Sequence, residues 1–184
     1  MTLFINACVR KDSRTKWLAE RLLAGLNEPV ERLDLGSMMF PVVDEAYLLR
    51  RDRLIAAQQF DDPLFAPAAQ FAAADSIVIA APFWDLSFPA VLKQYFEQIN
   101  VIGVTFRYTP QGVPEGLCRA GRLTYVTTAG GEFVPEDYGF GYVKALAQTF
   151  YGIPDVRLIK AVGLDLVGAD PEAILNAACD QFAR

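Results

Sequence analysis

SIVIAAPFWDLSFPAVLKQYFEQ, residues 76–98, combines a strand, a turn and a helix in one stretch of the chain. Residues 77–81 form a short apolar run with β-branched members, which is typical of a strand buried on both faces of a parallel sheet. Apolar residues then recur at helical spacing as far as residue 99, so they give a helix one apolar face. Ser87 is the predicted cap of this helix, and Pro89 is predicted in its first turn.

The turn between this strand and helix, residues 83–87, carries two large aromatic side chains, Phe83 and Trp84. Ligands of open α/β sheets bind in the crevice at the carboxyl ends of the strands. Two aromatic residues at such an end therefore suit contact with a flat ligand. The alternative is that Phe83 and Trp84 only cap the local core.

Strand patterns alternate with helical patterns along the rest of the chain, which predicts an α/β fold. The other predicted strands are residues 2–7, 30–35, 123–128 and 156–162. The predicted helices are the segment from the first loop to about residue 26, residues 46–59, 67–74 and 138–151, and a last helix from residue 170. We expect one domain over residues 1–184, a doubly wound five-stranded parallel sheet in the order 2-1-3-4-5 with helices on both faces.

Composition limits the function classes. Hydrophobic residues make up 53% of the 184-residue chain, so a sizeable core is expected. The net charge of −5 disfavours nucleic-acid and anionic-membrane binding. No apolar run is long enough to span a membrane, and no signal-peptide pattern is present at the amino terminus.

The chain contains no histidine and three scattered cysteines, Cys8, Cys118 and Cys179. Catalytic triads built on imidazole and the usual zinc sites are therefore excluded, and no metal site is expected. An odd number of distant cysteines disfavours a disulfide framework and favours the reducing cytoplasm. Any chemistry must come from other side chains or from a cofactor.

The loop after the first strand indicates an anion site. Ser13, Arg14 and Thr15 lie at a predicted helix amino terminus, with Arg10 nearby, so backbone N–H groups, hydroxyls and cations converge. The alternative is ordinary capping by Asp12 or Ser13 beneath a basic solvated face. The loop matches neither the P-loop nor the dinucleotide-binding glycine pattern.

Two further segments complete the candidate site. The fourth strand ends in Thr128, Ala129, Gly130 and Gly131, where the backbone can approach a ligand closely. Residues 100–117 read as a Pro- and Gly-containing loop, in which Phe106 and Tyr108 are predicted substrate contacts. An anion loop, an aromatic turn and a glycine pair at one sheet edge suit a flat ring that carries a phosphate.

These motifs together resemble the FMN-dependent NADH-azoreductases, also called FMN-dependent NADH–quinone oxidoreductases. The segments that carry the resemblance are SRT (13–15), APFWDLSFPAVLKQYFE (81–97), GVTFRYTPQGVPEGL (103–117) and TTAGG (127–131). The resemblance covers nearly the whole chain. It implies a flavodoxin-like fold, non-covalent FMN, NADH or NADPH as co-substrate, and a homodimer with the active site at the interface.

The resemblance also implies roles for individual residues. Ser13, Arg14 and Thr15 would hold the FMN phosphate, with Arg10 as an additional partner. The segment Phe83, Trp84, Asp85 and Leu86 would line the flavin ring, and the segment Thr128, Ala129, Gly130 and Gly131 would lie at its pyrimidine end. Asp85 stands where the family has an amide and Ala129 where it often has an arginine, so contacts at that end differ.

The implied reaction needs no protein acid or base. Reduced nicotinamide passes hydride to the flavin and leaves, and a quinone, or permissively an azo compound, then takes two electrons in the same slot. Three rival functions are a flavin reductase that uses free flavin, a flavodoxin-type electron carrier, and a non-enzymatic regulatory module. The aromatic residues of 100–117 disfavour the electron carrier, whereas the sequence leaves the other two open.

Overall fold

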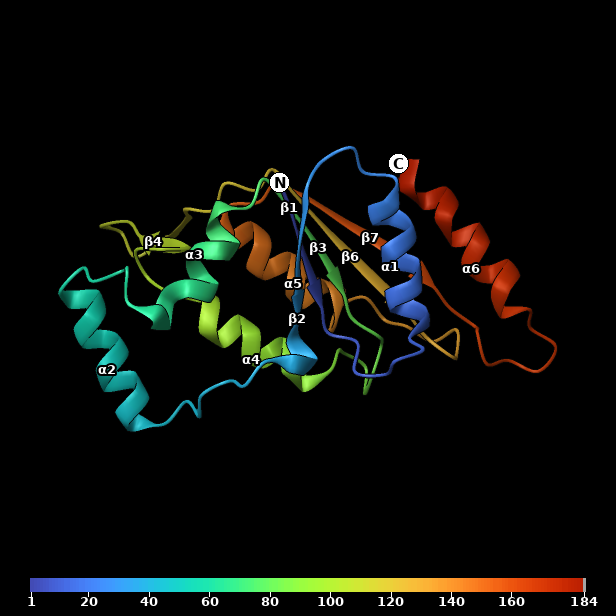
Figure 1. The fold of residues 1–184 in the computed structure, drawn as a ribbon, viewed down its shortest axis with the longest axis horizontal. Helices are drawn as coiled ribbons and strands as arrows, with labels where there is room; N and C mark the ends of the chain where they lie inside the picture. Colours follow the sequence, from blue (N-terminus) through green and yellow to red (C-terminus); the bar gives the residue numbers. More distant parts are fainter. Residues whose placement is uncertain (184) are drawn as a thin grey trace.

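The structure, a computed structural model, describes residues 1–183. Its central sheet has five parallel strands in the order β2-β1-β3-β6-β7 (Figure 1). The strands are β1 (Thr2–Asn6), β2 (Val30–Asp34), β3 (Ser76–Ala80), β6 (Arg122–Thr128) and β7 (Asp155–Ala161). The predicted fold class and strand order are confirmed, because β4 and β5 lie outside this sheet.

Helices alternate with the strands along the chain (Figure 1). They are α1 (Arg14–Ala24), α2 (Glu45–Ala56), α3 (Ala66–Ala73), α4 (Ala90–Ile99), α5 (Phe140–Leu146) and α6 (Pro171–Cys179). Shorter helical turns are η1 (Leu35–Ser37), η2 (Pro63–Phe65), η3 (Ala147–Tyr151) and η4 (Asp180–Ala183). No helix within residues 1–183 is long and apolar enough to cross a membrane.

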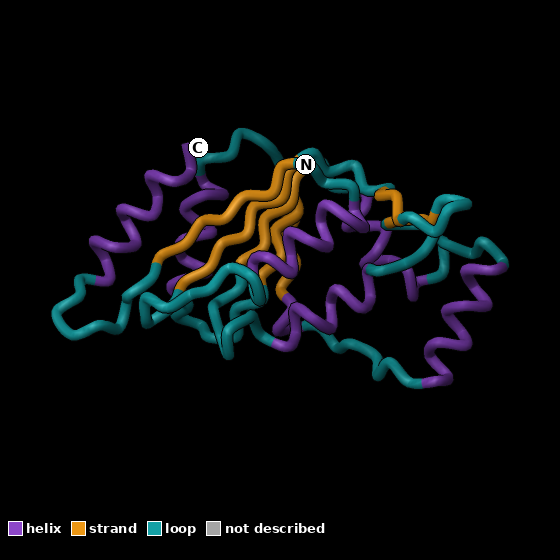
Figure 2. Tube along the Cα trace, turned by 180° about the vertical axis from the view of Figure 1, so that it is seen from behind, coloured by secondary structure: helices purple, strands orange, loops and turns teal. Residues whose placement is uncertain are grey.

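The two faces of the sheet are covered by different helices (Figure 2). Phe4, Val78 and Ile159 share one core cluster with buried residues of α1 and α6. Ile5 and Ile79, on the alternate positions, share the other cluster with residues of α3, α4 and α5. Because side chains alternate between faces along a strand, burial on both faces explains why β3 is apolar from Ile77 onward.

Helix α4 keeps its predicted apolar face but not its predicted cap. Tyr95, Phe96 and Ile99 are fully buried in the core. The predictions that Ser87 caps the helix and that Pro89 lies in its first turn are wrong, because α4 begins at Ala90 and Pro89 is the residue that precedes its first turn. Ser87 lies too early in the chain, and its hydroxyl donates to the backbone oxygen of Tyr138 at 3.3 Å.

Residues 100–117 form a hairpin and not the predicted loop. Strands β4 (Phe106–Tyr108) and β5 (Pro114–Gly116) pair antiparallel. The buried hydroxyl of Thr105 donates to the backbone oxygen of Ile99 at 2.6 Å, which fixes the hairpin to the end of α4. Phe106 is buried against Phe150, with ring centroids 4.7 Å apart. The hairpin is therefore part of the packed structure.

A close backbone approach joins this hairpin to η3. A Cβ atom placed on Gly116 would lie 2.1 Å from the nitrogen of Gly152 and 2.2 Å from the carbonyl carbon of Tyr151. Backbone atoms cannot yield as a flexible side chain can. Position 116 therefore requires glycine, because any side chain would collide with this backbone. Gly121 differs, since a Cβ added there would have no atom within 4 Å.

We predict that Gly116→Ala lowers the free energy of unfolding by roughly 3 kcal/mol, because the added methyl group forces the hairpin away from η3. Gly121→Ala is the matched control and should change stability by less than about 0.5 kcal/mol. Urea denaturation of both variants measures the difference. Equal stability of the two variants would contradict the packing described here.

Candidate functional site

A cavity of about 250 Å³ lies at the carboxyl edge of the sheet, where the loops after β1, β3, β6 and β7 meet. It is lined by Val9, Arg10, Asp12, Ser13, Arg14, Thr15, Pro82, Phe83, Trp84, Thr128, Ala129, Gly130, Leu164 and Asp165. Nine of the predicted site residues are among them: Arg10, Ser13, Arg14, Thr15, Phe83, Trp84, Thr128, Ala129 and Gly130. Strands β1 and β3 flank the point where the strand order reverses, so the cavity lies where open α/β sheets bind ligands.

The amino end of α1 forms the polar end of this cavity. Ser13 is the cap residue, and its hydroxyl accepts from the backbone nitrogen of Lys16 at 3.2 Å. This bond confirms the capping alternative for Ser13. The backbone N–H groups of Arg14 and Thr15, in the first turn, have no acceptor within the helix. They remain available to an anion, so capping and anion binding are compatible here.

A buried hydroxyl pair fixes the position of this helix end. The side-chain oxygens of Thr15 and Thr128 are 2.7 Å apart, and both residues are buried. The bond joins the first turn of α1 to the last residue of β6. The anion end and the glycine-containing loop after β6 are thereby held together.

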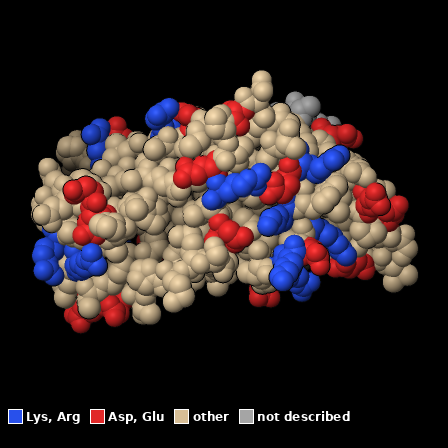
Figure 3. All heavy atoms as spheres, in the orientation of Figure 1, with Lys and Arg blue, Asp and Glu red and all other residues tan. Residues whose placement is uncertain are grey.

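Charged side chains of both signs surround the polar end. Figure 3 shows basic side chains gathered over the amino end of α1 with acidic ones among them. Arg14 Nη1 donates to Asp165 Oδ1 at 2.7 Å, with the two side chains 42% and 65% exposed. An ion pair so exposed contributes no more than about 1 kcal/mol. Arg10 is exposed as well and lines the same cavity.

Backbone hydrogen bonds continue beyond the sheet and bring the loops together. The nitrogen of Phe83 donates to the oxygen of Thr128 at 3.0 Å, which joins the loops after β3 and β6. The nitrogen of Asp165 donates to the oxygen of Gly130 at 2.9 Å, which joins the loops after β6 and β7. The cavity walls are therefore extensions of the strand pairing.

Phe83 and Trp84 form the aromatic side of the cavity. Phe83 is half-buried, while Trp84 remains 37% exposed. Trp84 and Ser87 close a tight turn, with the nitrogen of Ser87 donating to the oxygen of Trp84 at 2.7 Å. The exposed indole is available to a flat ligand, as the sequence predicts.

The central residues of this turn have unusual backbone angles. Asp85 has φ 50° and Leu86 has φ 65°, both in the left-handed region. Aspartate tolerates this conformation, but leucine does so only with strain. Asp85, Leu86 and Gly131 are all exposed, and none of the three lines the cavity. The flavin contacts that the resemblance implies for these three residues stay predictions.

The predicted substrate residues Phe106 and Tyr108 lie apart from this cavity. Neither is among its lining residues. Phe106 is buried at the base of the hairpin, and Tyr108 packs edge-on against it with ring centroids 5.5 Å apart. Within one chain they do not reach the site, so a substrate role for them requires a second copy of the chain.

Sequence reasoning missed the loop after β7. Leu164 and Asp165 complete the cavity wall, and Asp165 holds Arg14. The signal was available in part, because this loop also leaves the carboxyl edge of the predicted sheet.

A larger groove of about 560 Å³, with Leu22, Leu26 and Phe182 in its lining, lies at the opposite edge, away from the free amides of α1.

The described residues give this edge of the sheet neither a reactive thiol nor a cluster of metal ligands. Burial raises the pKa of the Cys8 thiol, directly after β1, to about 11, so the thiol is neutral near pH 7. Residues 1–183 contain no group of three or more His, Cys, Asp or Glu that could hold a metal ion. The arrangement binds and orients, and redox chemistry would come from a bound group.

Comparison with known proteins agrees with this geometry. A family model described as flavodoxin-like fold matches residues 1–184. The chain is 44% identical over 108 residues to an FMN-dependent NADH:quinone oxidoreductase of Lachnoclostridium phytofermentans, a match that covers 58% of this chain and 54% of that relative. It is 41% identical over 132 residues to the protein of the same description in Coprothermobacter proteolyticus, covering 67% and 65%. The matches thus span only about half to two thirds of these relatives.

Solved structures extend the similarity over nearly the whole chain. An azoreductase from Bacillus anthracis superposes with a TM-score of 0.85 at 25% identity, covering 99% of this chain and 96% of that one. An FMN-dependent NADH-azoreductase from the same species, solved with FMN, superposes with a TM-score of 0.81 at 25% identity, covering 98% and 94%.

The strained turn yields a stability prediction. Leu86→Gly should raise the free energy of unfolding by roughly 1 kcal/mol, because glycine adopts a positive φ without steric cost. Val167, exposed in the loop before α6 and outside the left-handed region, provides the control. Val167→Gly should be neutral or destabilising, because glycine adds freedom to the unfolded chain. Thermal unfolding compares the two, and a loss of stability in Leu86→Gly would contradict the strain.

Proposed function

The chain belongs to the flavodoxin-like fold family, and we propose that it is an FMN-dependent oxidoreductase. It takes hydride from NADH or NADPH and passes two electrons to quinones, and permissively to azo compounds, in alternating half-reactions. We propose further that residues 1–184 act as one FMN-binding domain.

One observation carries this proposal: a single cavity joins an anion-binding helix end to an exposed aromatic wall. The free amides of Arg14 and Thr15 and the cation of Arg10 suit a phosphate. Trp84 and Phe83 on the other wall suit an isoalloxazine ring. FMN has both parts, and the relatives named above are described as FMN-dependent.

The residues present fit FMN in their chemistry. Arg14 and Arg10 would balance the phosphate charge, and Ser13 would contact the phosphate while still capping α1. The loop of Thr128, Ala129 and Gly130 would lie at the ring's polar edge, and the missing side chain of Gly130 leaves room there for the Asp165 carboxylate. FMN supplies the two-electron chemistry when bound; the protein binds, orients and shields it.

The reaction is tested by reconstitution. Protein freed of flavin and then supplied with FMN should, in the absence of oxygen, oxidise NADH only until its bound FMN is reduced. It should turn over continuously only when a benzoquinone is added, with turnover saturating in FMN at the protein concentration. The same assay with excess riboflavin distinguishes a flavin reductase, which would turn over free flavin as a substrate. If the protein neither binds FMN nor oxidises NADH, the proposal is refuted, and the non-enzymatic regulatory module is the rival function that remains.

Arg14→Ala should weaken the binding of FMN more than the binding of riboflavin, because only FMN carries the phosphate. A charge-assisted hydrogen bond of this kind contributes about 1.5–3 kcal/mol, roughly ten- to a hundredfold in Kd. Flavin fluorescence titrations measure both constants. Arg21→Ala removes a charge near the other end of α1 and serves as the control. Equal losses for the two flavins would place the phosphate elsewhere.

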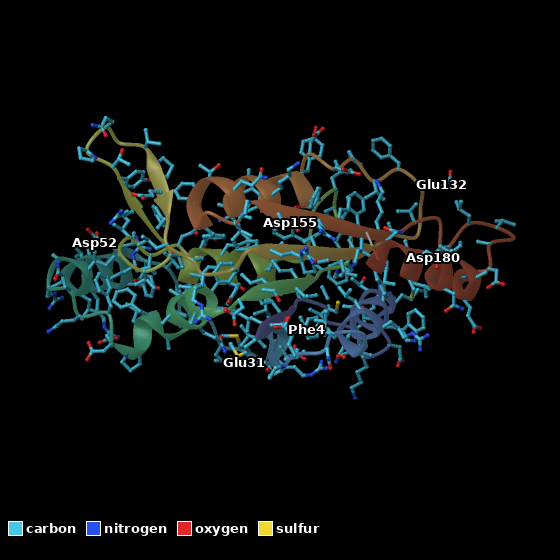
Figure 4. All side chains as sticks on the ribbon, turned by 90° about the horizontal axis from the view of Figure 1, so that it is seen from above. Phe4, Glu31, Asp52, Glu132, Asp155 and Asp180 are labelled. Carbon is cyan, nitrogen blue, oxygen red and sulfur yellow. The ribbon has the colours of Figure 1, made fainter. Side chains whose placement is uncertain are left out.

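We also propose that the chain forms a homodimer through the end that carries α2 and the hairpin. Helix α2 has no buried residue, and the segment before it exposes Met39 (97%) and Val42 (79%). Tyr108 and Val113 are exposed on the hairpin at the same end of the molecule (Figures 1 and 4). An apolar surface of this extent is costly in water unless a partner covers it.

Light scattering should give twice the mass of the chain at micromolar protein with flavin bound. Met39→Glu should shift the species toward one chain, because it places a charge in the contact. Phe133→Glu alters another exposed apolar residue, which follows the glycine pair, and should leave the mass unchanged. A single-chain mass for the unmodified protein would contradict the dimer.

A further inference from the structure

We propose that Asp165 competes with the phosphate of the ligand for Arg14 and so limits how tightly the site binds a phosphorylated flavin. The identity of the ligand rests on the proposed function, whereas the competition for an anion does not. No predicted site residue carries this role. The inference comes from the position of one carboxylate inside the cavity.

Asp165 is held in place by its backbone. Its nitrogen donates to the oxygen of Gly130 at 2.9 Å, and the neighbouring nitrogen of Leu164 donates to the oxygen of Ala129 at 3.2 Å. The carboxylate lies over Gly130 so closely that a Cβ there would be 2.2 Å from Oδ2. The Asp165 side chain therefore occupies the wall between the glycine loop and the amino end of α1.

Arg14 is the cation that this carboxylate engages. The two side chains meet through one contact, Nη1 to Oδ1 at 2.7 Å. Arg14 begins α1, whereas Asp165 lies in the loop after β7, and both line the cavity. Asp165 thus occupies the acceptor position toward Arg14 that a phosphate oxygen would take.

The charges of the lining side chains cancel. The cations Arg10 and Arg14 face the same cavity as the carboxylates Asp12 and Asp165. A phosphate monoester, with about −1.5 to −2 charge near pH 7, enters a site that has no net side-chain charge to attract it. Attraction then depends on the amides of α1 and on Arg14 changing its partner.

Magnitudes decide which partner Arg14 keeps. An exposed ion pair is worth up to about fivefold in an equilibrium constant, whereas a charge-assisted bond to phosphate is worth about ten- to a hundredfold. Arg14 therefore turns to the phosphate when it arrives. Asp165 is then left beside a like charge, so its net effect is to weaken binding.

Titration of FMN and riboflavin by fluorescence tests this directly. Asp165→Asn should bind FMN up to about fivefold more tightly than the unmodified protein and leave the riboflavin Kd unchanged. Asp165→Ala, which cannot accept a bond from Arg14, should do the same. The gain should shrink when Asp165→Asn is combined with Arg14→Ala. Asp61→Asn, an exposed carboxylate on another segment, makes the same change in net charge and should have no effect.

Weaker FMN binding by both variants would overturn the inference, because Asp165 would then be positioning Arg14 for the phosphate. Equal changes for FMN and riboflavin, or a change matched by Asp61→Asn, would overturn it as well. Inorganic phosphate is the probe that does not depend on flavin. At constant ionic strength, phosphate should raise the Tm of Asp165→Asn more than that of the unmodified protein, and an equal or smaller rise would contradict the competition. If neither flavin binds the unmodified protein, the proposed function fails and the phosphate measurement still decides this inference.

Discussion

All five strands of the sheet run in one direction, and the site depends on this constraint. A parallel sheet needs helices on both faces, so every strand must end in a loop at the same edge before a helix returns the chain. Four of those loops meet around one cavity. Backbone bonds that continue the strand pairing, such as Phe83 to Thr128, fix the loops relative to one another. The scaffold thus places the amino end of α1 and the aromatic residues Phe83 and Trp84 around one cavity.

The two ends of the cavity rely on different physics. At the polar end, the hydroxyl bond between Thr15 and Thr128 holds the free amides of α1 in position, while Arg14 and Asp165 offset each other's charge. At the aromatic end, Trp84 stays partly exposed beside a turn in which Asp85 and Leu86 have positive φ. Under the proposed function, a ligand with a phosphate and a flat ring engages both ends at once.

Much of this architecture could be predicted from the sequence, because local patterns carry it. The apolar run at 77–81 and the four other strand patterns gave the sheet and its order, and Asp170 before Pro171 marked the last helix. The capping by Ser13 followed from residue type and position. Nine of the predicted site residues meet in the cavity, since carboxyl ends of parallel strands share an edge.

The remaining features depend on contacts between distant residues. Asp165 meets Arg14 across 151 positions, which no local pattern reveals. The hairpin at 106–116 has the Pro and Gly content of a loop. Its regular structure is supported by the packing of Phe106 on Phe150 and of Gly116 on Gly152. The prediction of a Ser87 cap was wrong because α4 begins only after Pro89, and Ser87 instead forms backbone hydrogen bonds with Trp84 in the preceding turn.

The central claim is that one cavity at the carboxyl edge binds FMN, and amide hydrogen exchange with and without FMN tests where binding occurs. The account predicts that protection appears together in residues 13–15, 83–87 and 128–131, and in the loop that holds Asp165. Protection that appears instead in the groove at the opposite edge, around Leu22, Leu26 and Phe182, or no change in exchange at saturating FMN, would contradict it.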